Sequence, residues 1–147
     1  MIHLQNESSQ SHQIDLDLLV LAIQTTLDKF QKSDVDLTLR LTDDHEMQAL
    51  NRRFRGINAT TDVLSFNQDF IDPDTGTYYL GDLIISVDRS SQQASENHHT
   101  LTEECAFLAI HGTLHLLGYN HEEPEQKAVM WRLQDQIFEC IFKNYEE

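Results

Sequence analysis

Three histidines stand at a spacing that suits a metal ion: His111, His115 and His121, in the segment HGTLHLLGYNH. Because His111 and His115 are four residues apart, an α-helix would place both imidazoles on one face, one turn apart. Gly118 can take the left-handed conformation that ends a helix, so the chain can turn there and bring His121 back. Three imidazole ligands leave one coordination position free, which is typical of a catalytic zinc site. We therefore expect one zinc ion, although nickel and copper suit the same ligands.

Gly112 separates this segment from a known peptidase pattern. The spacing H-x-x-x-H-x-x-G-x-x-H is the ligand frame of the metzincins, in which a glutamate general base follows the first histidine. Gly112 cannot accept a proton, and glycine inside a helix costs about 1 kcal/mol relative to alanine. A metal-dependent peptidase remains an alternative, but Gly112 argues against it.

The first two histidines fall in a helix that we expect to begin at Thr102 and to lie at the centre of the fold. Apolar residues surround this helix on nearly every side, which is typical of a buried helix. They are Cys105, Phe107, Leu108, Ile110, Leu114 and Leu117. Two of the three ligands would thus lie on the most rigid element available. Cys105 and Cys140 both stand in apolar helical patterns, so we expect both to be buried rather than to bind metal.

The rest of the chain predicts a small sheet and further helices. Alternating or continuous apolar residues indicate four strands, at 2–5, 35–41, 63–66 and 78–87. Amphipathic spacing and capping residues indicate four more helices, at 15–32, from 43 to near 56, 88–97 and from 124 onward. This count favours an α/β or α+β layer arrangement, with the buried helix packed against the sheet. The length of 147 residues suits a single domain, 1–147.

Several residues receive more specific predictions. Apolar helical spacing places Phe54 on the core-facing side of the second helix, and Val129 and Trp131 on the core-facing side of the last helix. Asp88 is expected to cap the helix that follows it. The segment 67–77 is rich in turn-forming residues and is expected to be a loop or hairpin connection.

The charge balance limits how the chain can bind nucleic acid. Twenty-five acidic residues face ten basic ones, which gives a net charge of −15, so polyphosphate should be repelled at long range. Contact with an anionic partner must therefore be local, and Arg52, Arg53 and Arg55 lie close together. The same acidic surface would attract a basic protein partner. With neither a membrane-spanning apolar stretch nor a secretory signal, we expect a cytoplasmic location and no membrane contact.

Three stretches together resemble the YbeY endoribonucleases, also called rRNA maturation factors: LNRRFRGINATTDVLSF (50–66), YLGDLIIS (79–86) and HGTLHLLGYNH (111–121). The resemblance implies a metal-dependent, single-strand-specific endoribonuclease that matures the 3′ end of the small-subunit ribosomal RNA and takes part in ribosome quality control. It implies single-stranded or ribosomal RNA as the partner, with no DNA expected. It also implies a compact α/β sandwich with a mixed four-stranded sheet, zinc ligands at His111, His115 and His121, and a functional arginine at Arg55.

This chain departs from the family at two positions. The family often has aspartate where Asn120 stands, and an amide cannot act as a base. It commonly has proline where Thr60 stands, so this loop is expected to be less rigid.

Asp62 and Asp82 are favoured as turn and strand-edge residues over acceptors for a ligand imidazole. Ser65 suits contact with substrate as well as it suits a purely structural place in its strand.

Two chemical routes and one non-enzymatic role are compatible with these residues. A zinc ion acidifies bound water to a pKa of about 7, or it polarises a phosphoryl oxygen while the 2′-OH of the RNA attacks. Arg55 could pair bidentately with the charge that develops on phosphoryl oxygens. In the third interpretation, zinc is a structural staple and the protein is an assembly factor that binds ribosomal proteins.

Overall fold

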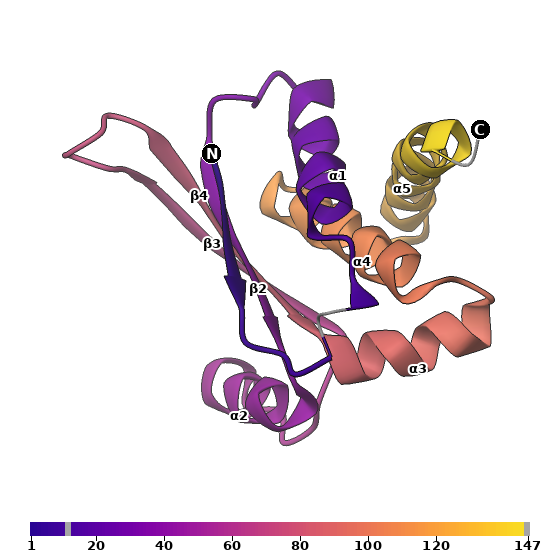
Figure 1. Ribbon diagram of the computed structural model, residues 1–147. Coiled ribbons are helices and arrows are strands. Elements are labelled where there is room, and N and C mark those ends of the chain that lie inside the picture. Colours follow the sequence, from indigo (N-terminus) through magenta and orange to yellow (C-terminus); the bar gives the residue numbers. More distant parts are fainter. Residues whose placement is uncertain (11–12, 146–147) are drawn as a thin grey trace.

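The computed structural model describes residues 1–10 and 13–145, which form four strands and five helices, as the sequence predicted (Figure 1). In chain order they are β1 (Ile2–Asn6), α1 (Leu16–Lys29), β2 (Asp36–Thr42), α2 (Asp44–Arg55), β3 (Val63–Ile71), β4 (Tyr78–Ser86), α3 (Val87–Asn97), α4 (Leu101–Leu116) and α5 (Pro124–Tyr145). Within the described ranges, no helix is both long enough and apolar enough to span a membrane.

The four strands form one mixed sheet in the order β1-β2-β4-β3. β1 pairs with β2 and β2 pairs with β4 in parallel, whereas β3 and β4 form an antiparallel hairpin. Parallel neighbours need a crossover connection, and α1 supplies the first while α2 and β3 supply the second. This is the mixed four-stranded α/β arrangement that the sequence and the family resemblance predicted.

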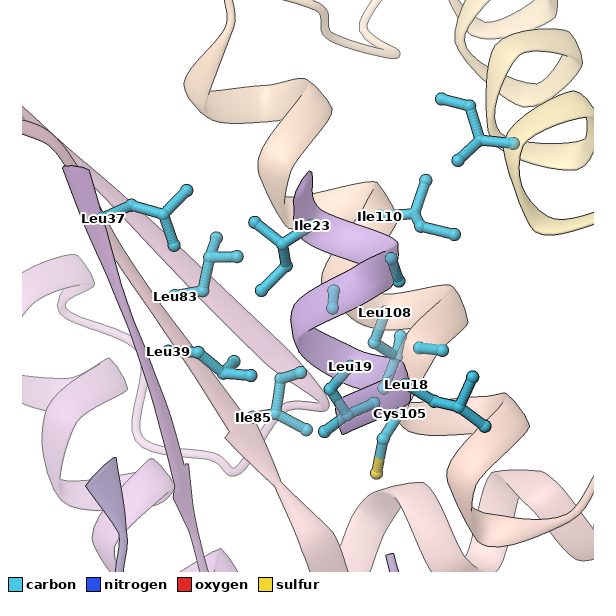
Figure 2. Packing of buried hydrophobic residues seen from close by; sticks show 14 of the residues in the cluster. Leu18, Leu19, Ile23, Leu37, Leu39, Leu83, Ile85, Cys105, Leu108 and Ile110 are labelled. Carbon is cyan, nitrogen blue, oxygen red and sulfur yellow. The ribbon is translucent and has the colours of Figure 1, made fainter. Parts of the chain in front are cut away.

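Helices cover the two faces of the sheet unequally. Leu83 and Ile85 point to one face, where they join the main core with α1, α4 and α5. Ile84 points to the other face and packs with Met47 of α2 and with Leu64, because side chains alternate along a strand. Figure 2 shows side chains of α1 directed toward those of β2 and β4. β4 is therefore covered on both faces, as its continuous apolar sequence predicted.

α4 lies at the centre of the molecule, in contact with α1, α3, α5, β3 and β4. Ten of its sixteen residues are buried, which confirms the predicted central helix. It begins at Leu101 rather than at Thr102, because Thr100 and Glu103 each accept a hydrogen bond from the backbone of the other. This capping box fixes the start of the helix that carries the first two histidines.

Two local predictions were wrong in part. β3 continues to Ile71, so only residues 72–77 connect the strands, and the hairpin projects beyond the rest of the sheet (Figure 1). Ser86, not Asp88, caps α3. Asp88 instead accepts a hydrogen bond from the backbone of Asp44 at 2.9 Å, which ties the start of α3 to the start of α2.

Some side chains predicted to be buried lie at the surface. Phe54 is 56% exposed and Val129 is 36% exposed. Cys140 is exposed as well, whereas Cys105 is buried, and neither forms a disulfide. Phe54 stands in the last turn of α2, beyond Met47, which fills the small core on that face of the sheet. Apolar spacing therefore located these helices but extended their buried stripes too far.

Candidate metal centre

The three histidines meet at one end of α4. His111 and His115 lie on α4, and His121 follows the turn at Gly118, whose φ of 104° is open to glycine but strained for other residues. One ligand nitrogen from each ring lies within 4.8 Å of the others, and the Nε2 atoms of His111 and His115 are 3.1 Å apart. The rings thus converge as the spacing predicts, and together they could hold a metal ion.

Gln134 determines which nitrogen of His111 faces the other rings. It lies on α5 and is 1% exposed. Its Nε2 donates to the Phe107 carbonyl at 3.4 Å, and its Oε1 lies 3.1 Å from Nδ1 of His111. The Phe107 carbonyl oxygen can only accept, so the NH2 group of Gln134 must point to it. Oε1 of Gln134 then faces His111, and Nδ1 of His111 must carry the proton. The unprotonated Nε2 therefore faces His115 and is free to bind a metal.

Burial keeps the two helical imidazoles neutral. Desolvation lowers the pKa of His111. Desolvation, together with the neighbouring His111 and His121, lowers the pKa of His115 to about 4. A neutral imidazole is the form that binds metal, so neither ring has to lose a proton at neutral pH. The donors present therefore fit a transition-metal ion such as zinc.

Trp131 forms a wall of this centre rather than part of the core, contrary to its prediction. It is 39% exposed, and its ring meets those of His111 and His121 edge-on, with centroids 5.7 Å apart in both pairs. Trp131 precedes Gln134 by three residues, so both side chains leave the same face of α5. α5 therefore supplies a hydrogen bond and an aromatic wall to the histidines of α4.

Gly112 packs closely against the sheet. A Cβ atom there would lie 2.7 Å from Cδ2 of Leu83, which is fully buried on β4. Glycine lets α4 pack closely on the sheet, and a glutamate at this position would have to displace Leu83. Packing therefore argues against the peptidase general base, as the sequence does.

Two cavities border the histidines, and we call the first the arginine side. It has a volume of about 400 Å³ and joins Arg55, at the end of α2, to His111, His115 and His121. The charge of Arg55 contributes to the lowered pKa of His115, as expected for a neighbouring cation. The structure thus brings the predicted functional arginine to the three predicted ligands. The other lining residues are Thr61, Asp62, Val63, Ser65, Gly112, Asn120 and Glu122.

We call the second cavity the acidic side. It has a volume of about 520 Å³ and also reaches His111 and His121. Its carboxylates come from Asp62, Glu96 and Glu104, and among the described residues no lysine or arginine lines it. The remaining lining residues are Val63, Gln93, Asn97, Phe107, Leu108, Trp131 and Gln134. The histidines therefore stand between two spaces of different charge.

Comparison with known proteins identifies the family. The model of the family described as Endoribonuclease YbeY matches residues 3–141. The chain belongs to this family. Endoribonuclease YbeY of Gloeobacter violaceus is 45% identical over 118 residues, which are 76% of this chain and 60% of that protein. Endoribonuclease YbeY of a Roseiflexus species is 39% identical over 141 residues, which are 91% of this chain and 88% of that protein.

A solved structure shows the same fold. The solution structure of TM1509 from Thermotoga maritima superposes with a TM-score of 0.68 at 27% sequence identity. The superposition covers 99% of this chain and 92% of that one. The arrangement of sheet and helices described above is therefore shared with an experimentally determined protein.

The two departures from the YbeY pattern make defined contacts. Asn120 Oδ1 accepts a hydrogen bond from the Glu122 backbone at 3.3 Å, so this amide shapes the turn around His121. The Thr60 hydroxyl donates to Asp44 Oδ1 at 3.0 Å. This bond ties the loop before β3 to the start of α2, where proline would have restricted the backbone instead.

The other YbeY motif residues lie at different distances from the histidines. Asp62 borders both cavities, and its charge acts on His111, but its carboxylate accepts a hydrogen bond from the Val63 backbone at 2.7 Å. Asp82 forms hydrogen bonds within the β3–β4 hairpin and borders neither cavity. Ser65 lines the arginine side. Asp82 thus has the structural place that we favoured, whereas Asp62 and Ser65 stand beside the centre.

Proposed function

We propose that this protein is a zinc-dependent endoribonuclease that cleaves single-stranded RNA. Its role would be the maturation of the 3′ end of small-subunit ribosomal RNA, with a part in ribosome quality control. One observation carries the proposal: Arg55 shares a cavity with His111, His115 and His121. A cation beside a metal-binding triad suits phosphoryl transfer, in which negative charge develops on phosphoryl oxygens. The relatives named Endoribonuclease YbeY support the same assignment.

His111, His115 and His121 would hold the zinc ion. Bound zinc supplies a Lewis acid, which lowers the pKa of water and polarises a phosphoryl oxygen. The chain supplies neutral donors, because burial lowers the pKa values of His111 and His115. Gln134 keeps Nε2 of His111 directed at the other two rings. The same donors suit nickel and copper, and zinc is our proposal for the working enzyme.

Arg55 would bind the scissile phosphate. Its guanidinium can donate two parallel hydrogen bonds to phosphate oxygens, and no ion pair among the described residues engages it. The hydroxyls of Thr61 and Ser65 line the same cavity and can donate to or accept from the substrate. The attacking hydroxyl belongs either to water or to the 2′ position of the RNA, and Asp62 lies where its carboxylate can orient that group.

The distribution of charge fits a ribosomal setting. A net charge of −15 repels RNA from most of the surface, so RNA should approach where Arg52, Arg53 and Arg55 lie together. The acidic remainder should attract basic ribosomal proteins. We therefore propose that the protein works in the cytoplasm, with RNA at the arginine side and ribosomal proteins on its acidic surface.

The test is cleavage of a labelled single-stranded RNA by purified protein of measured zinc content. Wild type is compared with His115→Ala, Arg55→Glu and a zinc-stripped sample, and circular dichroism checks that each is folded. His45→Ala and Arg132→Glu serve as matched controls, because both residues are exposed and border neither cavity. Wild type and controls should cleave, while the two site variants and the stripped sample should be at least about a hundredfold slower. The termini of the products would show whether water or the 2′-OH attacked.

Other outcomes would contradict the proposal. Equal cleavage by every sample would assign the activity to a contaminant. A zinc-loaded wild type that cleaves no RNA, and a folded His115→Ala variant that still supports ribosome maturation, would favour the assembly factor. Proteolysis of a plain protein substrate that depends on His111 would restore the peptidase interpretation.

A further inference from the structure

An exposed aromatic surface lies at the end of α2. Phe54 is 56% exposed, and Ile57 just beyond the helix is 51% exposed. The Phe54 ring contacts that of Phe66 on β3, with centroids 5.4 Å apart. The guanidinium of Arg53 lies over the Phe54 ring, 5.1 Å from its centroid. We call Arg53, Phe54 and Phe66 the aromatic platform.

The aromatic platform and the arginine side adjoin each other around one strand. Arg55 follows Phe54 on α2, Ser65 precedes Phe66 on β3, and both Arg55 and Ser65 line the arginine side. Successive residues of a strand point to opposite faces, so Ser65 faces the histidines while Phe66 faces α2. β3 is an edge strand of the sheet. Phe54 and Phe66 are thus sequence neighbours of residues that line the arginine side, which keeps the two surfaces close to each other.

Three arginines gather at the platform's end of α2 in an otherwise acidic protein. Arg52, Arg53 and Arg55 are three of the ten basic residues, and all lie in the last turn of α2. In the part of the chain that the structure describes, none of the three is paired with a carboxylate. A basic ribosomal protein would be repelled here, whereas a polyanion would be attracted. The charge therefore favours RNA as the occupant of this apolar surface.

Aromatic rings beside arginines are a common means of binding single-stranded nucleic acid. The bases stack on the rings, and the cations contact the backbone phosphates. Every base has a flat apolar face, so such binding tolerates many sequences. A base in a duplex already stacks on its neighbours and is not available, so a stacking surface favours single strands.

We propose that the aromatic platform binds a nucleobase of the single-stranded RNA substrate close to the phosphate held at the arginine side. This inference rests on the proposed function, because it places the RNA backbone beside Arg55. Phe54 stacks on the base, and Arg52 and Arg53 contact adjoining phosphates. The platform holds substrate without touching the reacting atoms, so its contribution falls on KM rather than on kcat.

The test is steady-state cleavage of a single-stranded RNA by the zinc-loaded protein. Phe54→Ala should raise KM about tenfold at unchanged kcat, which is within the range for one stacked base, and Phe54→Trp should restore KM. Phe70→Ala is the matched control, because Phe70 is 47% exposed on the same strand as Phe66 but in the projecting part of the hairpin. A substrate with abasic residues lacks the stacking partner, so wild type and Phe54→Ala should cleave it with the same KM.

Four results would overturn the inference. An unchanged KM for Phe54→Ala, with wild type and control active, removes the platform and leaves the nuclease function standing. An equal rise in KM on abasic RNA shows that Phe54 acts through the fold. A zinc-loaded wild type that cleaves no RNA removes the proposed function and the inference with it. Loss of binding to a ribosomal protein in Phe54→Ala, with KM for RNA unchanged, assigns the surface to a protein partner.

Discussion

The two cavities beside the histidines differ in charge although they share His111 and His121. The arginine side combines Arg55 with hydroxyl and amide groups and with the carboxylates of Asp62 and Glu122. The acidic side contains Glu96 and Glu104 and, within the part of the chain that the structure describes, no lysine or arginine. Arg55 therefore offers an anionic substrate a cation on the arginine side, whereas the acidic side offers it only like charges, which repel it.

The acidic side has a different task, which is to hold the ligands in place. Gln134 and Trp131 reach His111 from α5 on that side. Glu104 is 2% exposed and pairs with His99 at 3.0 Å. In the proposed function, substrate binding and the positioning of the histidines are therefore divided between the two sides of the same three rings. A protein with a net charge of −15 can thus present a small attractive surface to a polyanion.

The largest contrast should come from removing one charge on each side. Arg55→Ala should lower kcat/KM for RNA cleavage by about 10²–10³-fold, because a cationic partner of the developing charge is lost. Glu96→Ala, the matched change on the acidic side, should leave kcat/KM within about threefold, since only a distant repulsion is removed. Steady-state kinetics at equal zinc content measures both. Equal losses in the two variants would abolish the distinction between the sides.

The positioning task is tested on Gln134. Gln134→Met removes the acceptor for Nδ1 of His111 at similar size, and should weaken zinc binding by about 10–100-fold. Gln134→Glu keeps an acceptor for Nδ1, although it loses the donor to the Phe107 carbonyl, and should retain more of the affinity than Gln134→Met. Gln136→Met, on the exposed face of the same helix, is the control for any general effect on α5. Competition with a chelating dye measures each affinity, and an unchanged value for Gln134→Met would contradict the role.

A smaller difference should appear in the salt dependence of RNA binding. Each phosphate contact to a single strand contributes about 0.7 to the slope of log affinity against log salt concentration. Arg55→Ala should reduce the slope by about that amount, whereas Glu96→Ala should not change it. Fluorescence anisotropy with a cleavage-resistant RNA analogue gives the slopes. A slope in Arg55→Ala identical to that of wild type would remove the proposed phosphate contact.

The smallest effect concerns the stability of the zinc-free protein. The pKa of His115 is lowered from 6.5 to about 4 by burial and by the neighbouring histidines. Between these values the unfolded chain binds a proton that the folded protein does not, so the free energy of unfolding falls as the pH drops through this window. Urea denaturation at about pH 7.5 and about pH 5 should show this loss, and His115→Ala should reduce it. The same pH dependence in both proteins would show that other groups cause it.

The parts that could be predicted from the sequence depend on local signals. The spacing of His111, His115 and Gly118 requires only a helix and the turn that ends it. The alternating residues of β2 and the apolar residues all around α4 likewise show which faces are buried without knowledge of any partner. For this reason the four strands, the five helices and the convergence of the histidines agree with the structure.

The parts that could not be predicted depend on contacts between distant segments. Gln134 is 23 residues from His111 and looks like an ordinary polar position until α5 is packed against α4. Trp131 and Phe54 follow apolar helical spacing, which gives the direction of a side chain but not where the neighbouring element stops. The close approach of Gly112 to Leu83 is likewise visible only once the helix lies on the sheet.

The proposed metal ligands all come from one short segment, HGTLHLLGYNH. An ion bound there would join no remote parts of the chain, unlike a disulfide between distant segments. Because the loop that it closes is short, the ion would remove little conformational entropy from the unfolded chain. The sheet and the helices around it are held by buried apolar residues instead. We therefore expect the apoprotein to survive chelation as a folded molecule, unlike a zinc finger. One metal can then replace another without the protein unfolding in between.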